Sequence, residues 1–196
     1  SRLMGESVLP SWRDTTTREA IVSFAENAGE TVAPEERVAV FDNDGTLWCE
    51  KPMPVELGFI LLRLAEMAAK DESLRAKQPW KAAHERDFAW FGAVMDDHYA
   101  GDDTNVHTLA AGILAAYAGM SVEAFDATAK DWAARAKDHR WGRLYTELVY
   151  QPMEEVLALL RANGYRTYIV TGGGQAFVRS YAERVYGVAP AEVIGS

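Results

Sequence analysis

Apolar residues follow two patterns along this chain, and each pattern predicts a different kind of element. Short apolar runs bounded by turn residues occur at Val38–Phe41 and Arg166–Val170, a pattern typical of buried parallel strands. The last residues, "EVIGS", predict the beginning of a third strand. Helical spacing runs from Pro152 to Gly164 and returns over Gln175–Tyr186. Strands that alternate with helices in this order predict an α/β core with a parallel sheet.

Helical spacing alone marks the N-terminal region and the long middle of the chain. Thr16 and Glu19 form a capping-box pattern at the start of a helix that we expect to stop at Gly29. Four amphipathic segments without a convincing strand between them predict a helical bundle. We expect these helices over Val55–Ala69, Trp80–Met95, Thr104–Ala118 and Ser121–Ala136. We therefore assign residues 1–50 and 148–196 to the core and residues 51–147 to an inserted helical domain.

Composition and charge narrow the classes of function. The 196 residues are 48% hydrophobic, which is enough for a sizeable core. A net charge of −9 argues against a nucleic-acid partner, although a local metal or backbone nest can still attract a small anion. No apolar run reaches the length of a membrane span, so none is predicted. The single cysteine, Cys49, excludes an intrachain disulfide and favours a reducing, cytoplasmic location, while a periplasmic or secreted mature form stays open.

Chemically unusual residues follow both predicted strands. Two aspartates, Asp42 and Asp44, come directly after the first strand, and Thr171–Gly174 follows the second. Ligands of open α/β sheets bind at the carboxyl ends of the strands. One carboxylate of such a pair can attack an electrophile while the other moves a proton, and crowding the two implies a hard cation such as Mg²⁺. The alternative is a purely structural role, in which these aspartates form an Asx turn after the strand.

The second strand end suits a phosphate group. Thr171 offers a hydroxyl, and the glycines after it offer amides without side chains at the predicted start of a helix. The bland alternative is a glycine-rich turn that allows close packing. Because both strand ends lie at one edge of the predicted sheet, we favour a site where a phosphate meets two carboxylates.

The combination of "DNDGTL" after an apolar strand with "YIVTGG" later resembles the haloacid dehalogenase superfamily. The branch it resembles most is that of the phosphoserine-phosphatase-like enzymes with a helical cap, which implies a Rossmann-like core. The resemblance implies that Asp42 is a nucleophile forming an aspartyl-phosphate and that Asp44 is the general acid/base. It implies that Thr171, with the amides of Gly172 and Gly173, holds the phosphoryl group. The Asp42 carboxylate and the Asp44 carbonyl would bind Mg²⁺, and an aspartate at position 44 argues against the dehalogenase branch.

Residues after the first motif are candidates for substrate contacts. In capped members of the superfamily this stretch forms a flap that faces the active site. We therefore single out Trp48, Glu50 and Glu56 as candidate substrate contacts, and we add Arg143, near the return of the chain to the core. Hinge packing and surface charge are the alternative roles for these side chains.

The chain departs from the superfamily pattern in one respect. The superfamily places a lysine and an acidic motif after the second motif, but no Lys and no Asp follows Thr171. We interpret the chain as a core whose C-terminal part is missing, which leaves open the activity of residues 1–196 alone. The predicted function is a Mg²⁺-dependent phosphomonoesterase acting on a small phosphorylated metabolite. Alternatives are a phosphotransferase or phosphomutase, and a catalytically impaired fragment that binds phosphate or a partner; substrate and oligomeric state are not predicted.

Overall fold

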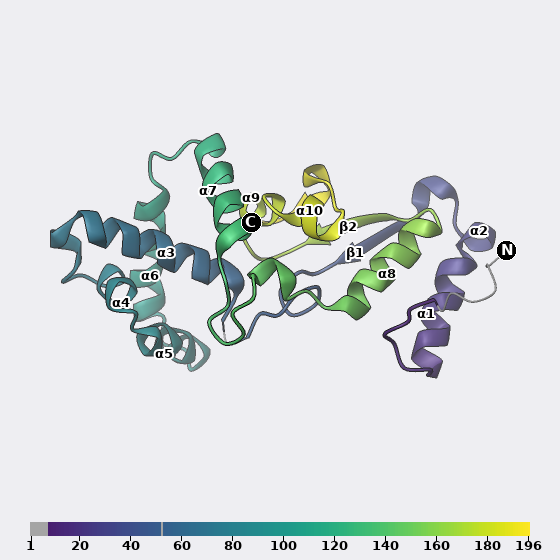
Figure 1. The fold of residues 1–196 in the computed structure, drawn as a ribbon, viewed down its shortest axis with the longest axis horizontal. Coiled ribbons are helices and arrows are strands. Elements are labelled where there is room, and N and C mark those ends of the chain that lie inside the picture. The colour runs from purple at the N-terminus through teal and green to yellow at the C-terminus, as the bar shows by residue number, and fades with distance from the viewer. Residues whose placement is uncertain (1–7, 52) are drawn as a thin grey trace. The chain divides into compact units, whose positions relative to one another are not determined.

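The computed structural model describes residues 8–51 and 53–196, which fall into two compact units (Figure 1). Unit 1 comprises Ser1–Lys51 and Lys130–Ser196, and unit 2 comprises Pro52–Ala129. Residues 130–147, which sequence analysis assigned to the insert, thus belong to unit 1. Residues 1–7 of the predicted core and residue 52 of the predicted insert lie outside the described residues.

A three-stranded parallel sheet organises unit 1. Its strands are β1 (Val38–Phe41), β2 (Arg166–Val170) and β3 (Val193–Ile194), in the order β1-β2-β3. Phe41 pairs with Ile169, which pairs on its other side with Val193. The bounds predicted for the first two strands are confirmed, and the chain has the predicted α/β, Rossmann-like fold.

Helix α8 (Gln151–Ala162) packs against β2, and helix α1 (Thr16–Glu26) packs against α8. Their side chains share a buried cluster against which Ala39 and Phe41 pack. The opposite face exposes apolar side chains, whose exposed fractions are Val38 42%, Val40 60%, Val170 43% and Ile194 51%. Alternation along the strands therefore separates a covered face from an open one.

The helix ends of unit 1 follow local sequence signals, with one shift. The side chain of Thr15, not Thr16, caps α1 by accepting a hydrogen bond from the amide of Arg18, so the predicted cap is wrong by one residue. A short helix, α2 (Ala28–Thr31), follows. Pro152 lies in the first turn of α8, as predicted. Proline fits there because the first N–H groups of a helix have no acceptor within the helix, so the N–H that proline lacks is not needed.

The predicted helix over 175–186 is wrong in one respect, because it is two short helices. These are α9 (Gln175–Arg179) and α10 (Ala182–Tyr186), separated by Ser180 and Tyr181. The Ser180 hydroxyl donates to the Phe177 carbonyl at 2.6 Å, which occupies an acceptor of the ending helix. The break turns the Tyr181 ring into the core, where it is 1% exposed.

Unit 2 is helical, as predicted. Its helices α3 (Val55–Lys70), α4 (Trp80–Glu85), α5 (Phe88–Tyr99) and α6 (Thr104–Tyr117) share one buried core, and α7 (Val122–Arg135) continues from it into unit 1. The single helix predicted over 80–95 is wrong. Arg86 adopts a left-handed conformation (φ 56°) that ends α4, and the Asp87 side chain caps α5.

Short 3-10 turns connect several of these elements; they lie at Pro34–Glu36, Glu72–Leu74, Tyr145–Glu147 and Pro190–Glu192.

Among the residues that the structure describes, no single helix is long and apolar enough to cross a membrane, although the bent pair α6 and α7 passes the same length and composition test together.

Candidate active site

The two motifs lie at the same edge of the sheet. Phe41 and Ile169 are register partners on adjacent parallel strands, so Asp42 begins the loop after β1 next to the end of β2. Thr171 begins the turn after β2, and its amide donates to the Ile194 carbonyl of β3 at 2.9 Å. The structure thus brings together the loop carrying Asp42 and Asp44 and the turn carrying Thr171, from stretches far apart in sequence.

The loop after β1 is a tight turn closed by main-chain bonds. The amides of Thr46 and Leu47 donate to the Asn43 carbonyl at 3.1 and 2.9 Å, and the Gly45 amide donates to the Trp48 carbonyl at 3.0 Å. Gly45 has φ +74°, a conformation that favours glycine. The turn reverses the chain immediately after the two aspartates and leaves Asp42 exposed.

Main-chain bonds also tie this loop to the residues before α8. The Cys49 amide donates to the Leu148 carbonyl at 3.1 Å, and the Tyr150 amide donates to the Leu47 carbonyl at 2.8 Å. Trp48 and Val149 form an antiparallel bridge between these bonds. The loop is therefore fixed on two sides, by β1 and by the segment 148–150.

The two carboxylates have different surroundings. One oxygen of the exposed Asp42 carboxylate accepts a hydrogen bond from the Asn43 amide at 2.8 Å. The half-buried Asp44 carboxylate accepts a hydrogen bond from the indole N–H of Trp48, also at 2.8 Å. One carboxylate therefore faces solvent, whereas the other is held by a core side chain.

Burial raises the pKa of the Asp44 carboxyl above its ordinary value and outweighs the hydrogen bond from Trp48, which lowers the pKa. The negative charges of Glu50 and Asp42 raise this pKa further. A carboxyl with a raised pKa keeps its proton to a higher pH. Asp44 is therefore suited to donate a proton and later to accept one.

Asn43, between the two aspartates, is a buried polar residue with 1% exposure. Its side-chain NH₂ donates to the Tyr181 hydroxyl at 2.8 Å, and its side-chain oxygen accepts from the Tyr186 hydroxyl at 3.1 Å. Burial raises the pKa of Tyr186, so this hydroxyl keeps its proton and remains a donor. Asn43 thus joins the loop after β1 to the helices after Thr171.

The turn after β2 combines a buried hydroxyl with an open glycine. The Thr171 hydroxyl oxygen accepts from the Gly173 amide at 3.0 Å, and Thr171 is 7% exposed. Gly172 is exposed, and no atom lies within 4 Å of the position that a Cβ would occupy there. The Ser196 hydroxyl contacts the carbonyl oxygens of Gly172 and Gly173 at 3.2 and 3.0 Å. These contacts order the carbonyl side of the turn.

A family model of haloacid dehalogenase-like hydrolases matches residues 39–196, which include both motifs and the helical insert. The chain belongs to this family. A search of curated proteins found no match to the chain.

Within this haloacid dehalogenase-like hydrolase, the candidate substrate contacts lie in different places. Trp48 is 1% exposed and stacks on Tyr181, so its ring is a core contact of unit 1 rather than a free surface. Glu50 lies over Gly45, with a carboxylate oxygen 2.9 Å from the position of a Cβ there, and its charge acts on Asp44. Of the four candidates, Glu50 is thus the one that contacts the loop of the two aspartates and is also partly exposed.

The remaining two candidates interact with other charged or polar side chains. Glu56 lies in the first turn of α3 in unit 2, where its charge acts on the buried hydroxyl of Tyr117. Arg143 is exposed in unit 1 and pairs with Glu147 at 3.7 Å. The charge of Arg143 is therefore paired with a carboxylate four residues along the chain.

The oxygen atoms of this hydrolase's loop fit a hard cation. The Asp42 carboxylate and the Asp44 carbonyl are the type of ligand that Mg²⁺ takes, and Mg²⁺ usually needs only one or two carboxylates besides water and a substrate phosphate. Within residues 8–51 and 53–196, no group of three or more His, Cys, Asp or Glu side chains gathers into a metal cluster. Asp42 and Asp44 therefore remain the candidates from the sequence for holding such an ion, without a larger cluster around them.

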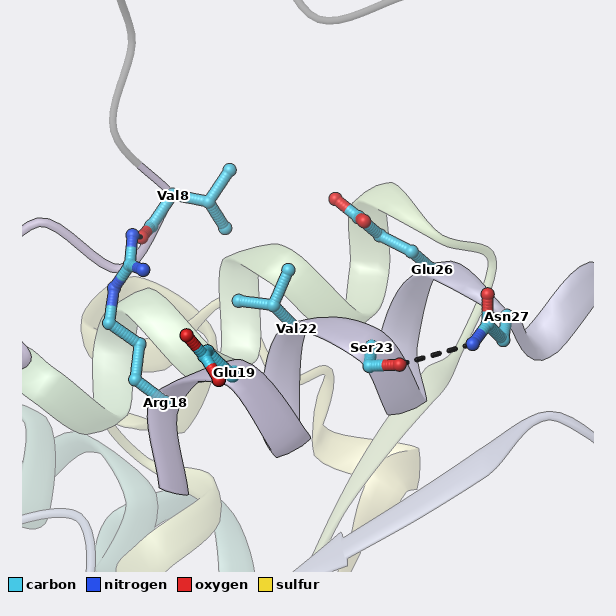
Figure 2. A pocket seen from close by; sticks show the side chains of 7 residues that line it. All are labelled: Val8, Arg18, Glu19, Val22, Ser23, Glu26 and Asn27. Atoms are coloured by element: carbon cyan, nitrogen blue, oxygen red, sulfur yellow. Dashed lines mark hydrogen bonds between the residues drawn. The ribbon is translucent and has the colours of Figure 1, made fainter. Parts of the chain in front are cut away.

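Two surface pockets of unit 1 lie away from both motifs. One, of about 260 Å³, lies beside α1, where Asn27 donates to Ser23 at 3.1 Å (Figure 2). The other, of about 390 Å³, has a basic lining that includes Arg179 and Arg184. Neither is lined by Asp42, Asp44 or Thr171, so neither is the site of the two motifs.

Sequence reasoning missed the buried residues that form hydrogen bonds with the loop after β1. The Asn43 side chain bonds to Tyr181 and Tyr186, which lie in the helical segment after the second motif. The one local signal was an amide side chain inside the first motif. Gly195 was missed as well. A Cβ there would lie 2.8 Å from the Gln175 Cα and 2.9 Å from the Gly173 carbonyl oxygen, so only glycine fits where the chain leaves β3 beside this turn.

Proposed function

We propose that the chain is a Mg²⁺-dependent phosphomonoesterase that acts on a small phosphorylated metabolite through an aspartyl-phosphate on Asp42. The observation that carries this proposal is the strand register, which sets the loop of Asp42 and Asp44 beside the turn of Thr171. Membership in a hydrolase family supports the reaction class. The open oxygen of Asp42 supports its role as nucleophile.

In the first step, an Asp42 carboxylate oxygen attacks phosphorus and the bond to the leaving alkoxide breaks. Asp44, whose pKa is raised by burial, gives a proton to that alkoxide. In the second step, a water attacks the phosphorus of the aspartyl-phosphate and Asp44 takes the proton from it. This step releases phosphate and regenerates the Asp42 carboxylate.

The turn of Thr171 would bind the transferring group. Because the Thr171 oxygen accepts from the Gly173 amide, its own hydrogen can donate to a phosphoryl oxygen. The exposed Gly172 leaves room for a phosphate to approach the main chain. A Mg²⁺ ion held by Asp42 and Asp44 would neutralise charge on the phosphoryl oxygens.

A second candidate is a chain that binds phosphate without turning it over. The exposed Gly172 beside the Thr171 hydroxyl would favour binding of a phosphate whether or not Asp42 reacts with it. Phosphotransfer to an alcohol acceptor shares the first step and differs only in what attacks the aspartyl-phosphate.

The test is hydrolysis of an aryl phosphate with and without Mg²⁺, comparing the unmodified chain with Asp42→Asn and Asp14→Asn. Asp14 is an exposed carboxylate two residues before α1, paired with Arg18 at 4.0 Å, so its substitution controls for loss of charge. We expect Mg²⁺-dependent turnover that Asp42→Asn abolishes and Asp14→Asn leaves intact. Phosphate binding without turnover would favour the second candidate instead.

A further inference from the structure

The indole of Trp48 makes a contact that the reaction above does not require but that determines where the Asp44 carboxylate lies. The ring is 1% exposed, and its N–H donates to one Asp44 oxygen at 2.8 Å. An indole N–H is only a donor, so it offers the carboxylate a single fixed direction. One Asp44 oxygen is therefore occupied, and the other is left to exchange a proton.

Trp48 is itself held on both sides. Its ring stacks on Tyr181 with centroids 4.6 Å apart and an interplanar angle of 28°. Its main chain is bridged to Val149 and to Asp44. Neither the ring nor the backbone can therefore move without breaking other contacts.

The contacts around Asp44 form a closed ring. Tyr181 carries the stacked indole, and its hydroxyl accepts from the Asn43 side chain at 2.8 Å. Asn43 also accepts from Tyr186 at 3.1 Å and directly precedes Asp44 in the chain. The contacts run from Asp44 through Trp48 and Tyr181 to Asn43 and back to Asp44 along the main chain.

A purely structural role would not need these particular atoms. An apolar ring at position 48 could fill the same space against Tyr181, but only tryptophan extends an N–H to the Asp44 carboxylate. Buried hydrogen bonds restrict side chains to one arrangement. The result is a single orientation for the one carboxylate that must point at the leaving group.

We propose that Trp48 is a positioning residue for Asp44, and that Asn43, Tyr181 and Tyr186 hold it in place. The proposal rests on the proposed function, because positioning matters only if Asp44 transfers the proton. Trp48 contacts no substrate in this account and acts through Asp44 alone.

The kinetic test compares Trp48→Phe with Trp132→Phe. Trp132 is also buried in unit 1, at 5% exposure, and stacks on Tyr145, so this control removes an indole of similar burial. We expect Trp48→Phe to lower kcat about 10- to 100-fold while KM changes less than about twofold, because the proton transfer is misaligned. We expect Trp132→Phe to retain kcat, and equal kcat in the two variants would overturn the proposal.

A second measurement does not depend on turnover. In a ¹H–¹⁵N spectrum, the Trp48 indole signal is the one that Trp48→Phe removes, and we expect Asp44→Asn to shift it more than Asp14→Asn does. An indole signal that Asp44→Asn leaves in place would overturn the proposal even if the chain is active. If the unmodified chain has no turnover although the signal shifts, the proposed function fails and the catalytic role of Trp48 fails with it, while the contact stands.

Discussion

Asp138 is buried, although the residues on either side of it are exposed. The Arg140 side chain donates to its carboxylate at 2.9 Å, and the Arg140 amide donates to it at 2.8 Å. These bonds lower the pKa of the Asp138 carboxyl, with the side-chain bond as the largest cause. A buried carboxylate that is satisfied in this way stabilises the fold as long as it remains charged.

Replacing Asp138 with Asn should therefore reduce the free energy of unfolding by about 1–3 kcal/mol at neutral pH. Folding lowers the pKa of this carboxyl, so its contribution is complete above the unfolded value, about 3.9, and is lost as the pH falls through the lower folded value. Urea unfolding at neutral pH and at the lowest pH that preserves the fold would measure this. The difference between the two proteins should shrink in acid.

Asp131→Asn is the matched control for that experiment. Asp131 also pairs with an arginine, Arg135, but both side chains are exposed. An exposed pair of this kind contributes about 0–1 kcal/mol. An equally large effect of both substitutions would contradict the role assigned to the burial of Asp138.

At the scale of elements, the contact between α6 and the start of α4 depends on a glycine. A Cβ on Gly112 of α6 would lie 2.3 Å from Cγ and 2.6 Å from Cδ of Pro79. A proline ring cannot swing away as a long flexible side chain can. Gly112 therefore sets how closely these two elements of unit 2 can approach.

Gly112→Ala should destabilise the protein by about 1–3 kcal/mol through this clash. The sign is informative, because alanine in an exposed helix interior normally stabilises relative to glycine by about 0.5–1 kcal/mol. Gly92→Ala in α5 is the control: no atom lies within 4 Å of its Cβ position, and we expect it to stabilise. Thermal unfolding would compare the two, and a gain in both would refute the close contact.

Elements that obey local rules were predictable from sequence, and those that depend on distant contacts were not. The strands β1 and β2 were predicted in full because short apolar runs end at turn residues. The breaks at Arg86 and Tyr181 were missed, because one needs a left-handed residue without glycine and the other is tied to Asn43, 138 residues away. For the same reason Asp42, Asp44 and Thr171 could be assigned to one edge of the sheet. The buried contacts of Asn43 with Tyr181 and Tyr186 could not be predicted.

At the scale of the whole chain, the sheet of unit 1 has unequal faces. Ile169 on the covered face is 0% exposed, whereas Val40 on the open face is 60% exposed. Parallel sheets are usually covered on both faces. An open apolar face should bind hydrophobic dyes even while the protein is folded.

We expect Val40→Lys to lower dye fluorescence in the folded protein and to change the free energy of unfolding by no more than about 0.5 kcal/mol. Ile169→Ala, on the covered face, should cost about 2–5 kcal/mol. Dye binding and urea unfolding, measured on both variants, check the two faces together. A loss of stability in Val40→Lys as large as in Ile169→Ala would show that the open face is covered.

The main-chain bonds between residues 47–49 and 148–150 have a consequence for how this hydrolase can change. They join the two ends of residues 50–147, so this segment, which contains unit 2, is a loop closed at its base. The entropy of closing a flexible loop grows only with the logarithm of its length, and a doubling costs about 0.6 kcal/mol. Insertions and deletions in unit 2 should therefore change the free energy of folding of unit 1 only slightly. The inserted domain can then diversify in sequence while the positions of Asp42 and Asp44 are kept.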